Sequence, residues 1–320
     1  MKIAVLTTNP AENFKLEEAA KNKGHQIIFI DQKETLHYIS EYLQGNEGFY
    51  TTNKDGGEPR KLQSGEIDVV IPRMVGNEEF CAAILRFIVD NIGAFCPNDP
   101  WLYFFASNKL YTLQKAAAAG ILLPKQIIAE DPSHFSWIMD QVQLPVIVKA
   151  WNGSKISTIG ICDSIKSANS LISFSFHSGL KIIVESFIET GGIDYSAWVI
   201  GGQVPFAMKR MGGHGGKYEK AELSKADQEL CVNAARSIGL DVAGIVFIKD
   251  TITGKSYILD ISPNPDDKII DPNGQNPFEN LIDYCEENMK KKDTGPGNNL
   301  NARKSSNTDL PVLLFGLLNL

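Results

Sequence analysis

The stretch that decides how this chain is interpreted is 144–155, which reads LPVIVKAWNGSK. The apolar run Val146–Val148 is typical of a buried strand, and it ends on Lys149 before a small-residue turn at Gly153-Ser154. A buried ammonium group without a partner is costly, so a lysine at this place needs a reason. A phosphate supplies one, because backbone N–H groups in such a turn also bind anions. An alternative stays open here, in which the side chain of Lys149 only reaches from the strand end to the surface.

The first hundred residues alternate between strand and helix patterns. Apolar runs predict strands at Ile3–Leu6, Gln26–Ile30 and Glu66–Pro72, and apolar spacing predicts helices at Asn13–Asn22 and Glu78–Asn91. Short connections between such elements indicate a βαβ unit with a parallel sheet.

The rest of the chain mixes helices with strands joined by tight turns, among them a hairpin signal at Gly201-Gly202. The region 45–57 reads as a loop or a small hairpin. Together these patterns predict an α/β domain joined to α+β lobes. The predicted helices are Ser107–Ala119, one beginning near Ser133 as N-cap, Lys225–Gly239 capped by Ser224, and Phe278–Lys290. The predicted strands are Gln126–Ala129, Val146–Lys149, Ile182–Glu185, Ser196–Ile200, Gln203–Met208, Ala243–Lys249 and Ser256–Ile261.

Composition narrows the class of protein. With 320 residues, 43% of them hydrophobic, the chain is long enough for two or three domains. A net charge of −7 argues against a nucleic-acid partner. Five scattered cysteines without a CxxC pair favour reduced thiols. The apolar run at Met1–Leu6 is too short for a signal peptide core, and no apolar run in the sequence is long enough for a membrane span. We therefore expect a soluble cytoplasmic protein.

The polar segment 291–309 is expected to be disordered, and the apolar end 310–320 to be loose or packed on a partner.

Further segments before and after Lys149 in the sequence bear on the function, and their order along the chain is informative. The run Lys181–Ile188 reads KIIVESFI, a strand that ends on a carboxylate and an aromatic, and Asp194 follows it. Upstream, Asn108-Lys109 opens a helix. None of these segments is specific alone, but their order resembles the ATP-grasp superfamily, and most closely its RimK-like glutamate ligases. The resemblance extends to about residue 290 and includes Met1–Leu6, Asp68–Arg73, Val146–Lys149, His214–Gly216, Leu240–Gly244 and Ile258–Ile261.

The resemblance implies an ATP-grasp fold with a pre-ATP-grasp domain over 1–98, a central lobe over 99–184, a C-terminal lobe over 185–290, and a tail over 291–320. It implies ATP and Mg²⁺ as cofactors, with the γ-phosphoryl group passing to a carboxylate. An amine then attacks the acyl phosphate and forms an amide or peptide bond. The implied substrates are a small-molecule or peptide carboxylate and an amino acid such as glutamate. Similar proteins form dimers and tetramers, so a homo-oligomer is an expectation too.

The resemblance also assigns roles to single residues. Lys149 and Lys109 match the phosphate lysine and the second nucleotide lysine, and the hinge at 184–188 matches the segment whose backbone holds adenine. Arg73 matches an arginine that faces the substrate cleft. Lys209 and Arg210 lie where the family has basic residues for the phosphate or the acyl group. For Arg73 and Lys209, an ordinary solvated charge stays open as the alternative. The expected nucleotide-binding residues are Lys109, Lys149, Gly153, Ser154, Glu185, Ser186, Phe187, Ile188 and Asp194.

The chain departs from the family pattern at its catalytic parts. Ile156 and Thr158 stand where the glycine-rich loop has further glycines. At the metal site Val246 stands where an Asp is expected and Ser262 where an Asn is, which leaves Asp260 and Asn264 as the expected ligands of a weakened Mg²⁺ site. The segment 209–216 is also shorter than in the family.

Two hypotheses follow. The first is an ATP-dependent carboxylate–amine ligase, and the alternative is a catalytically degenerate ATP-grasp protein that binds nucleotide or a partner in a scaffolding or regulatory role.

Overall fold

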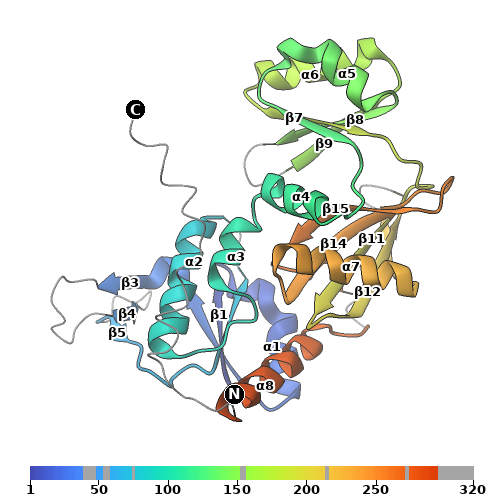
Figure 1. Cartoon of the computed structure of the whole chain (residues 1–320). Coiled ribbons are helices and arrows are strands. Elements are labelled where there is room, and N and C mark those ends of the chain that lie inside the picture. The colour runs from blue at the N-terminus through green and yellow to red at the C-terminus, as the bar shows by residue number, and fades with distance from the viewer. Residues whose placement is uncertain are drawn as a thin grey trace.

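The computed structural model describes residues 1–38, 48–52, 58–73, 76–151, 156–212, 216–270 and 274–294. Three bodies are visible in Figure 1, with the N-terminal domain below, a lobe carrying α5 and α6 above, and a lobe carrying α7 beside them. No helix in these ranges combines the length and the apolar character that crossing a membrane requires.

The N-terminal domain is built on a parallel sheet, as the sequence predicts. Its strands are β1 (Lys2–Thr7), β2 (Gln26–Asp31) and β6 (Val69–Arg73), in the order β2-β1-β6. The apolar side chains of β1 fill both faces of the sheet, since Ile3 and Val5 join one core cluster and Ala4 and Leu6 another. The helices are η1 (Pro10–Asn13), α1 (Phe14–Asn22) and α2 (Glu78–Phe87), which a π-helical turn, η3 (Ile88–Ile92), extends.

A small antiparallel sheet interrupts this domain. It consists of β3 (Thr35–Tyr38), β4 (Gly48–Thr51) and β5 (Arg60–Lys61), with the short helix η2 (Gln32–Glu34) before it. The hairpin alternative for the region 45–57 is confirmed for β4, while 39–47 and 53–57 lie outside the described residues.

The chain then leaves the N-terminal domain through two short helices. The first, α3 (Pro100–Phe105), was not predicted, and it packs on α2. The second, α4 (Lys109–Ala118), begins two residues after the predicted Ser107, because the Asn108 side chain caps it by accepting from the N–H groups of Leu110 and Tyr111. Helix α4 packs on α7 and β15.

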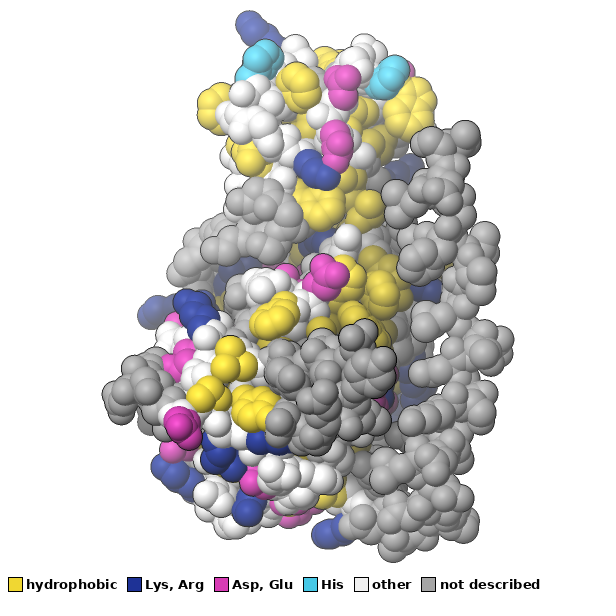
Figure 2. Space-filling view, turned by 90° about the vertical axis from the view of Figure 1, so that its left-hand side faces the viewer, with side chains coloured by type: hydrophobic (Ala, Val, Ile, Leu, Met, Phe, Trp, Pro, Cys, Tyr) yellow, Lys and Arg dark blue, Asp and Glu magenta, His cyan; other side chains and the backbone are white. Residues whose placement is uncertain are grey.

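We call the next unit the four-stranded lobe. It contains β7 (Gln126–Ala129), β8 (Val146–Trp151), β9 (Ile156–Cys162) and β10 (Lys181–Ser186), all antiparallel, in the order β7-β10-β8-β9. The helices α5 (Phe135–Val142) and α6 (Ile165–His177) cover one face (Figure 1). Figure 2 shows hydrophobic side chains on the outer surface of this upper lobe.

Two expectations for this lobe need correction. Ser133 is not the N-cap of α5, because it lies inside the short helix η4 (Pro132–His134) and His134 takes the cap position. The backbone N–H of Ser133 instead donates to the carboxylate of Asp131. The strand β9 and the helix α6 were not predicted at all.

We call the unit that follows the five-stranded lobe. Its antiparallel strands are β11 (Ile193–Ile200), β12 (Gln203–Met211), β13 (Lys217–Lys220), β14 (Val242–Lys249) and β15 (Ser256–Ser262), in the order β13-β12-β11-β14-β15. The predicted Gly201-Gly202 hairpin is confirmed, with φ of 57° and 79° at its glycines, values that favour glycine. Helix α7 (Lys225–Ile238) covers one face, capped by Ser224 as predicted.

The last helix joins the five-stranded lobe to the N-terminal domain. Helix α8 (Phe278–Thr294) packs on α1 and on the sheet face opposite α7, where Phe278 meets Trp198 with ring centroids 5.0 Å apart. One core cluster therefore contains side chains from β1, β6, β11, β12 and α8. The segment 291–309 was expected to be disordered, but its first residues, 291–294, are helical. The rest of that segment lies outside the described residues.

A buried asparagine ties the same two bodies together before α3. Asn98 is 3% exposed, and its Oδ1 accepts from the N–H groups of Asp241 and Val242, both at 2.9 Å. Its Nδ2 donates to the Val242 carbonyl at 2.8 Å. The side chain thus satisfies three backbone groups where β14 begins.

We expect Asn98→Ala to lower the free energy of unfolding by about 2–3 kcal/mol, because buried backbone groups lose their partners. Urea unfolding followed by circular dichroism measures this change. Asn91→Ala is the matched control, since the Asn91 side chain is exposed and caps only the Phe87 carbonyl, and we expect a change within about 0.5 kcal/mol. An equal effect of both substitutions would contradict the role given to Asn98.

Candidate active site

The sheet of the four-stranded lobe has one apolar face and one face that carries charge. Val146, Val148 and Val184 belong to the core beneath α5 and α6. Because side chains alternate along a strand, Lys149 and Glu185 lie on the opposite face. That face is turned toward α4 and the five-stranded lobe (Figure 1). We use the name cleft for the region that Lys149 and Glu185 share with Lys109 of α4 and Asp260 of β15, two charges that act on the pKa of Lys149.

Lys149 and Glu185 form a buried ion pair on the cleft face. The distance from Lys149 Nζ to Glu185 Oε1 is 2.6 Å, and the two side chains are 11% and 5% exposed. Burial lowers the pKa of Lys149, and the neighbouring Glu185 carboxylate works against this by favouring the charged form. The sequence predicted Lys149 from its strand-end position, but it gave Glu185 only a backbone role, so the pairing is new.

A second ion pair approaches from the other side of the cleft. Lys109 Nζ, in the first turn of α4, lies 3.5 Å from Asp260 Oδ1 on β15. Lys109 lowers the pKa of Lys149 and Asp260 raises it, so both groups lie within electrostatic reach of Lys149. Four of the residues predicted from the sequence therefore meet in one place, although they come from β8, β10, α4 and β15.

The segment after β10 offers free backbone groups beside these charges. The N–H of Ser186 donates to the Lys125 carbonyl at 2.8 Å, and that of Phe187 donates to the Pro145 carbonyl at 3.0 Å. Ile188 has neither its N–H nor its C=O engaged within the described part of the chain. The predicted hinge thus presents one donor and one acceptor at the same residue.

Asp194 and Arg210 face each other across neighbouring strands. The register of β11 and β12 pairs them, and Arg210 donates to Asp194 Oδ2 from Nη2 at 2.6 Å and from Nε at 3.0 Å. The Asp194 hydrogen bond, ahead of other causes, raises the pKa of Arg210, which therefore stays charged. Both lie on the sheet face that also holds Trp198, since they are an even number of residues from Trp198 and its neighbour Phe206.

Lys209 does not share that face. As the residue before Arg210, it points to the α7 side of the sheet, where its Nζ lies 3.4 Å from Glu219. The structure therefore separates the two basic residues that the sequence placed together.

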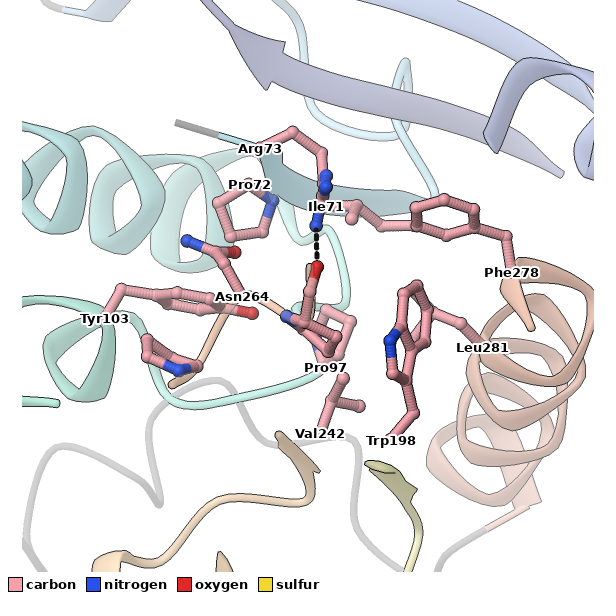
Figure 3. Close-up of a pocket in the computed structure, with 12 residues that line it drawn as sticks. Ile71, Pro72, Arg73, Pro97, Tyr103, Trp198, Val242, Asn264, Phe278 and Leu281 are labelled. Carbon is pink, nitrogen blue, oxygen red and sulfur yellow. Dashed lines mark hydrogen bonds between the residues drawn. The ribbon is translucent and has the colours of Figure 1, made fainter. Parts of the chain in front are cut away.

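Arg73 lines a small pocket between the N-terminal domain, α8 and the loop after β15 (Figure 3). Its guanidinium donates to the Pro265 carbonyl at 2.9 Å and lies 3.0 Å from Asp267. It also lies over the ring of Phe278, with 5.3 Å from Cζ to the centroid. These contacts make Arg73 a tie between bodies, and its buried Nε has no partner in the described structure. Its expected place on the substrate cleft is a proposal that these contacts do not support.

The described residues do not fit a metal site built from several protein carboxylates. No group of three or more His, Cys, Asp or Glu side chains suited to a metal ion occurs among them. Asp260 is paired with Lys109, and the residue directly across from it on β14 is the apolar Val246. The second expected ligand, Asn264, lines the pocket of Arg73 and Tyr103 (Figure 3). We therefore derive no catalytic step through a protein-held metal ion.

Some predicted residues lie outside the described ranges. Gly153 and Ser154, the expected start of the phosphate loop, are among them, as is His214. Thr158, a departure from the family pattern, pairs with Lys149 across β8 and β9.

Curated relatives match most of this chain. A probable alpha-L-glutamate ligase of Haemophilus influenzae strain Rd is 28% identical over 90% of this chain and 98% of its own length. The protein of the same description from Pasteurella multocida is 30% identical over 83% of this chain and 87% of its own length.

Solved structures share the fold. The macrocyclase MdnC of Microcystis aeruginosa, bound with the precursor peptide MdnA, has a TM-score of 0.64 at 15% identity, covering 88% of this chain and all of MdnC. The ATP-grasp ligase PsnB, complexed with a minimal precursor, Mg and ADP, has a TM-score of 0.63 at 16% identity, covering 90% of this chain and 98% of PsnB.

The model of the RimK-like ATP-grasp domain matches residues 106–284, which contain Lys109, Lys149, Glu185 and Asp260. This chain therefore belongs to the RimK-like ATP-grasp family.

Proposed function

We propose that the cleft between the two lobes binds ATP and uses it to activate a substrate carboxylate for attack by an amine. The enzyme is an ATP-dependent ligase that forms a carbon–nitrogen bond. In the proposed reaction a carboxylate oxygen takes the γ-phosphoryl group and ADP leaves. The amine nitrogen then attacks the acyl carbon, phosphate leaves, and the nitrogen loses a proton as the amide forms. Activation is needed because a free carboxylate is a poor electrophile.

The observation that carries this proposal is the buried Lys149. Its side chain is 11% exposed and burial lowers its pKa, so a phosphate beside it would add to the stabilisation of the charged form that burial disfavours. Lys109 supplies a second ammonium group from the opposite wall. Such preorganised cations stabilise the charge on a transferring phosphoryl group.

The other residues take roles that fit their places. We assign the adenine to the hinge Glu185–Ile188, where the free N–H and C=O of Ile188 match the acceptor and donor on one edge of the base. We assign Arg210, oriented by Asp194, to the phosphoryl or acyl oxygens. Lys209 faces the other side of its sheet, so we give it no part in the reaction.

The same proposal covers cofactors and domains. ATP would enter with Mg²⁺ held mainly by its own phosphates, and Asp260, which lies beside Lys109, is the protein carboxylate that we assign to the ion. We propose the division into a pre-ATP-grasp domain over 1–98, a central lobe over 99–184 and a C-terminal lobe over 185–290. The residues Gly153 and Ser154 stay proposed phosphate contacts on sequence grounds alone.

For the substrates we propose glutamate as the amine, with a peptide or small-molecule carboxylate as the acceptor. The names of the curated relatives support glutamate, and MdnC and PsnB are both bound with precursor peptides. We also propose a cytoplasmic homo-oligomer without nucleic-acid or membrane partners.

The test of the function is ADP release from ATP and Mg²⁺ with glutamate and a set of peptide and small carboxylates. We expect release that requires both substrates, with the amide product detected by mass spectrometry. ATP binding without any such turnover would favour the alternative of a degenerate binding protein, which the comparisons do not support.

Lys149→Ala should weaken ATP binding at least tenfold, because the substitution removes the buried cation and leaves the Glu185 carboxylate unpaired in the cleft. Isothermal titration with a non-hydrolysable ATP analogue measures the dissociation constant. Lys166→Ala, at an exposed lysine of α6, is the matched control and should bind like the wild type. Unchanged affinity in Lys149→Ala would remove the central assignment.

ATP affinity should fall at alkaline pH, and the fall should begin below the ordinary lysine pKa of 10.5. Burial lowers the pKa of Lys149, so the nucleotide-free protein loses this proton early, and binding must then restore it. The same shift makes the free energy of unfolding rise with pH in this window, because the unfolded chain binds more protons than the folded one.

A pH series of ATP dissociation constants measures the first effect. Lys149→Arg keeps its charge throughout and should remove the early part of the fall. A wild-type profile identical to that of Lys149→Arg would contradict the role of the lowered pKa.

A further inference from the structure

A second polar side chain stands on the cleft face beside Glu185. Gln126, the first residue of β7, pairs directly with Glu185 of β10 in the antiparallel register. Ile127 and Ala129 pack on the α5–α6 side, so alternation turns Gln126 and Ile128 toward the cleft. Directly paired side chains on one sheet face lie about 5 Å apart at their Cβ atoms, so Gln126 is an immediate neighbour of the buried ion pair.

The amide oxygen of Gln126 is buried and has no hydrogen-bond partner among the described residues. Apart from Glu185, whose carboxylate supplies no donor for this oxygen, its neighbours on this face are apolar, since Ile128, Ile183 and Ile147 occupy the adjoining register positions. A buried acceptor without a donor destabilises the folded state, and apolar side chains of similar length would avoid that cost. A ligand that donates a hydrogen bond removes the deficit.

The position of Gln126 fixes where that ligand lies. The carbonyl of the preceding residue, Lys125, accepts the N–H of Ser186, so β7 begins at the entrance of the hinge. Two residues further along the hinge, the N–H and C=O of Ile188 are free. An unpaired acceptor on the sheet and an unpaired donor and acceptor on the hinge therefore border the same end of the cleft. All three groups suit a flat heterocycle that carries an amino group.

We propose that Gln126 Oε1 accepts a hydrogen bond from the 6-amino group of the adenine base and is a specificity-determining residue for ATP. This inference rests on the proposed binding of ATP in the cleft and deepens it. The 6-amino group carries two protons, so one donates to Gln126 while the other stays available to the hinge carbonyl. A purine without this amino group leaves the Gln126 oxygen without a hydrogen-bond donor, just as that oxygen is in the ligand-free structure.

The probes are ATP and purine riboside 5′-triphosphate, which lacks only the 6-amino group and keeps the ring nitrogens and the phosphates. Titration calorimetry gives the dissociation constants for the wild type, for Gln126→Met, and for the control Gln228→Met. The control makes the same substitution at an exposed position of α7, where the amide donates to the Leu223 carbonyl.

We expect the wild type and the control to bind ATP about a hundredfold more tightly than the purine analogue, because the analogue loses both hydrogen bonds of the amino group, to Gln126 and to the hinge carbonyl, each worth about tenfold. Gln126→Met should bind ATP about tenfold more weakly while its affinity for the analogue stays unchanged. Its melting temperature without ligand should not fall, because methionine has a similar length and no unpaired acceptor. A purely structural role for Gln126 would lower the melting temperature and weaken both ligands equally.

The outcomes separate this inference from the proposed function. If the wild type binds neither nucleotide, the proposed function fails. Gln126→Met should keep only the part of the preference that the hinge carbonyl supplies. If the wild type binds ATP but does not prefer it to the analogue, or if Gln126→Met keeps the full wild-type preference, the role of Gln126 is wrong and ATP binding stands.

Discussion

A single buried ammonium group, that of Lys149, sets the conditions that the rest of the cleft must meet. Removed from water, it needs a carboxylate, and Glu185 on the neighbouring strand provides one at 2.6 Å. This pairing depends on the register of β8 and β10, which puts Lys149 opposite Ile183 and Glu185 two residues further along. A slip of either strand by one residue would turn its charged side chain into the apolar core beneath α5 and α6 and break the pair. The charge pair and the hydrophobic pattern therefore specify the same register.

The opposite wall of the cleft depends on a different core. The five-stranded lobe and the N-terminal domain share one hydrophobic cluster around α8, with Trp198 and Phe278 at its centre, and Asn98 and Arg73 tie the two bodies together. The core of the four-stranded lobe, in contrast, contains only residues between 127 and 184. Lys109 and Asp260 thus belong to a joint base, while Lys149 and Glu185 belong to a lobe with its own core. This arrangement suits a clamp that closes on a ligand between the base and the lobe.

The local sequence pattern predicts most of the strands. It also predicts those residues that are recognised by their position at the end of a strand. Lys149 is recognised because it ends an apolar run, and the Gly201-Gly202 hairpin is recognised because backbone with positive φ favours glycine. The helix α6 was missed because its many serines weaken the helix signal, although Ser164 caps it and Ala168 and Ile172 pack into the core of the lobe.

Side-chain partners were harder to predict than elements. Alternation along β12 could have placed Lys209 and Arg210 on opposite faces, but the partner of Arg73, Asp267, is 194 positions away in the chain and no local pattern links them. The orphaned oxygen of Gln126 is likewise visible only once β7 and β10 are paired.

The charges of the cleft also bear on how a metal ion would take part. Without nucleotide, Lys109 forms an ion pair with Asp260 and Lys149 forms one with Glu185. Of these four described side chains, neither carboxylate is left without a cationic partner. Val246, across from Asp260, adds no second ligand. A triphosphate that draws both lysines toward itself weakens their hold on the two carboxylates, which then face the phosphates as like charges. A divalent cation that arrives on the nucleotide relieves this repulsion, whereas a cation binding first would have to displace Lys109. The charge balance therefore favours the metal–nucleotide complex, rather than the free metal ion, as the species that enters this cleft.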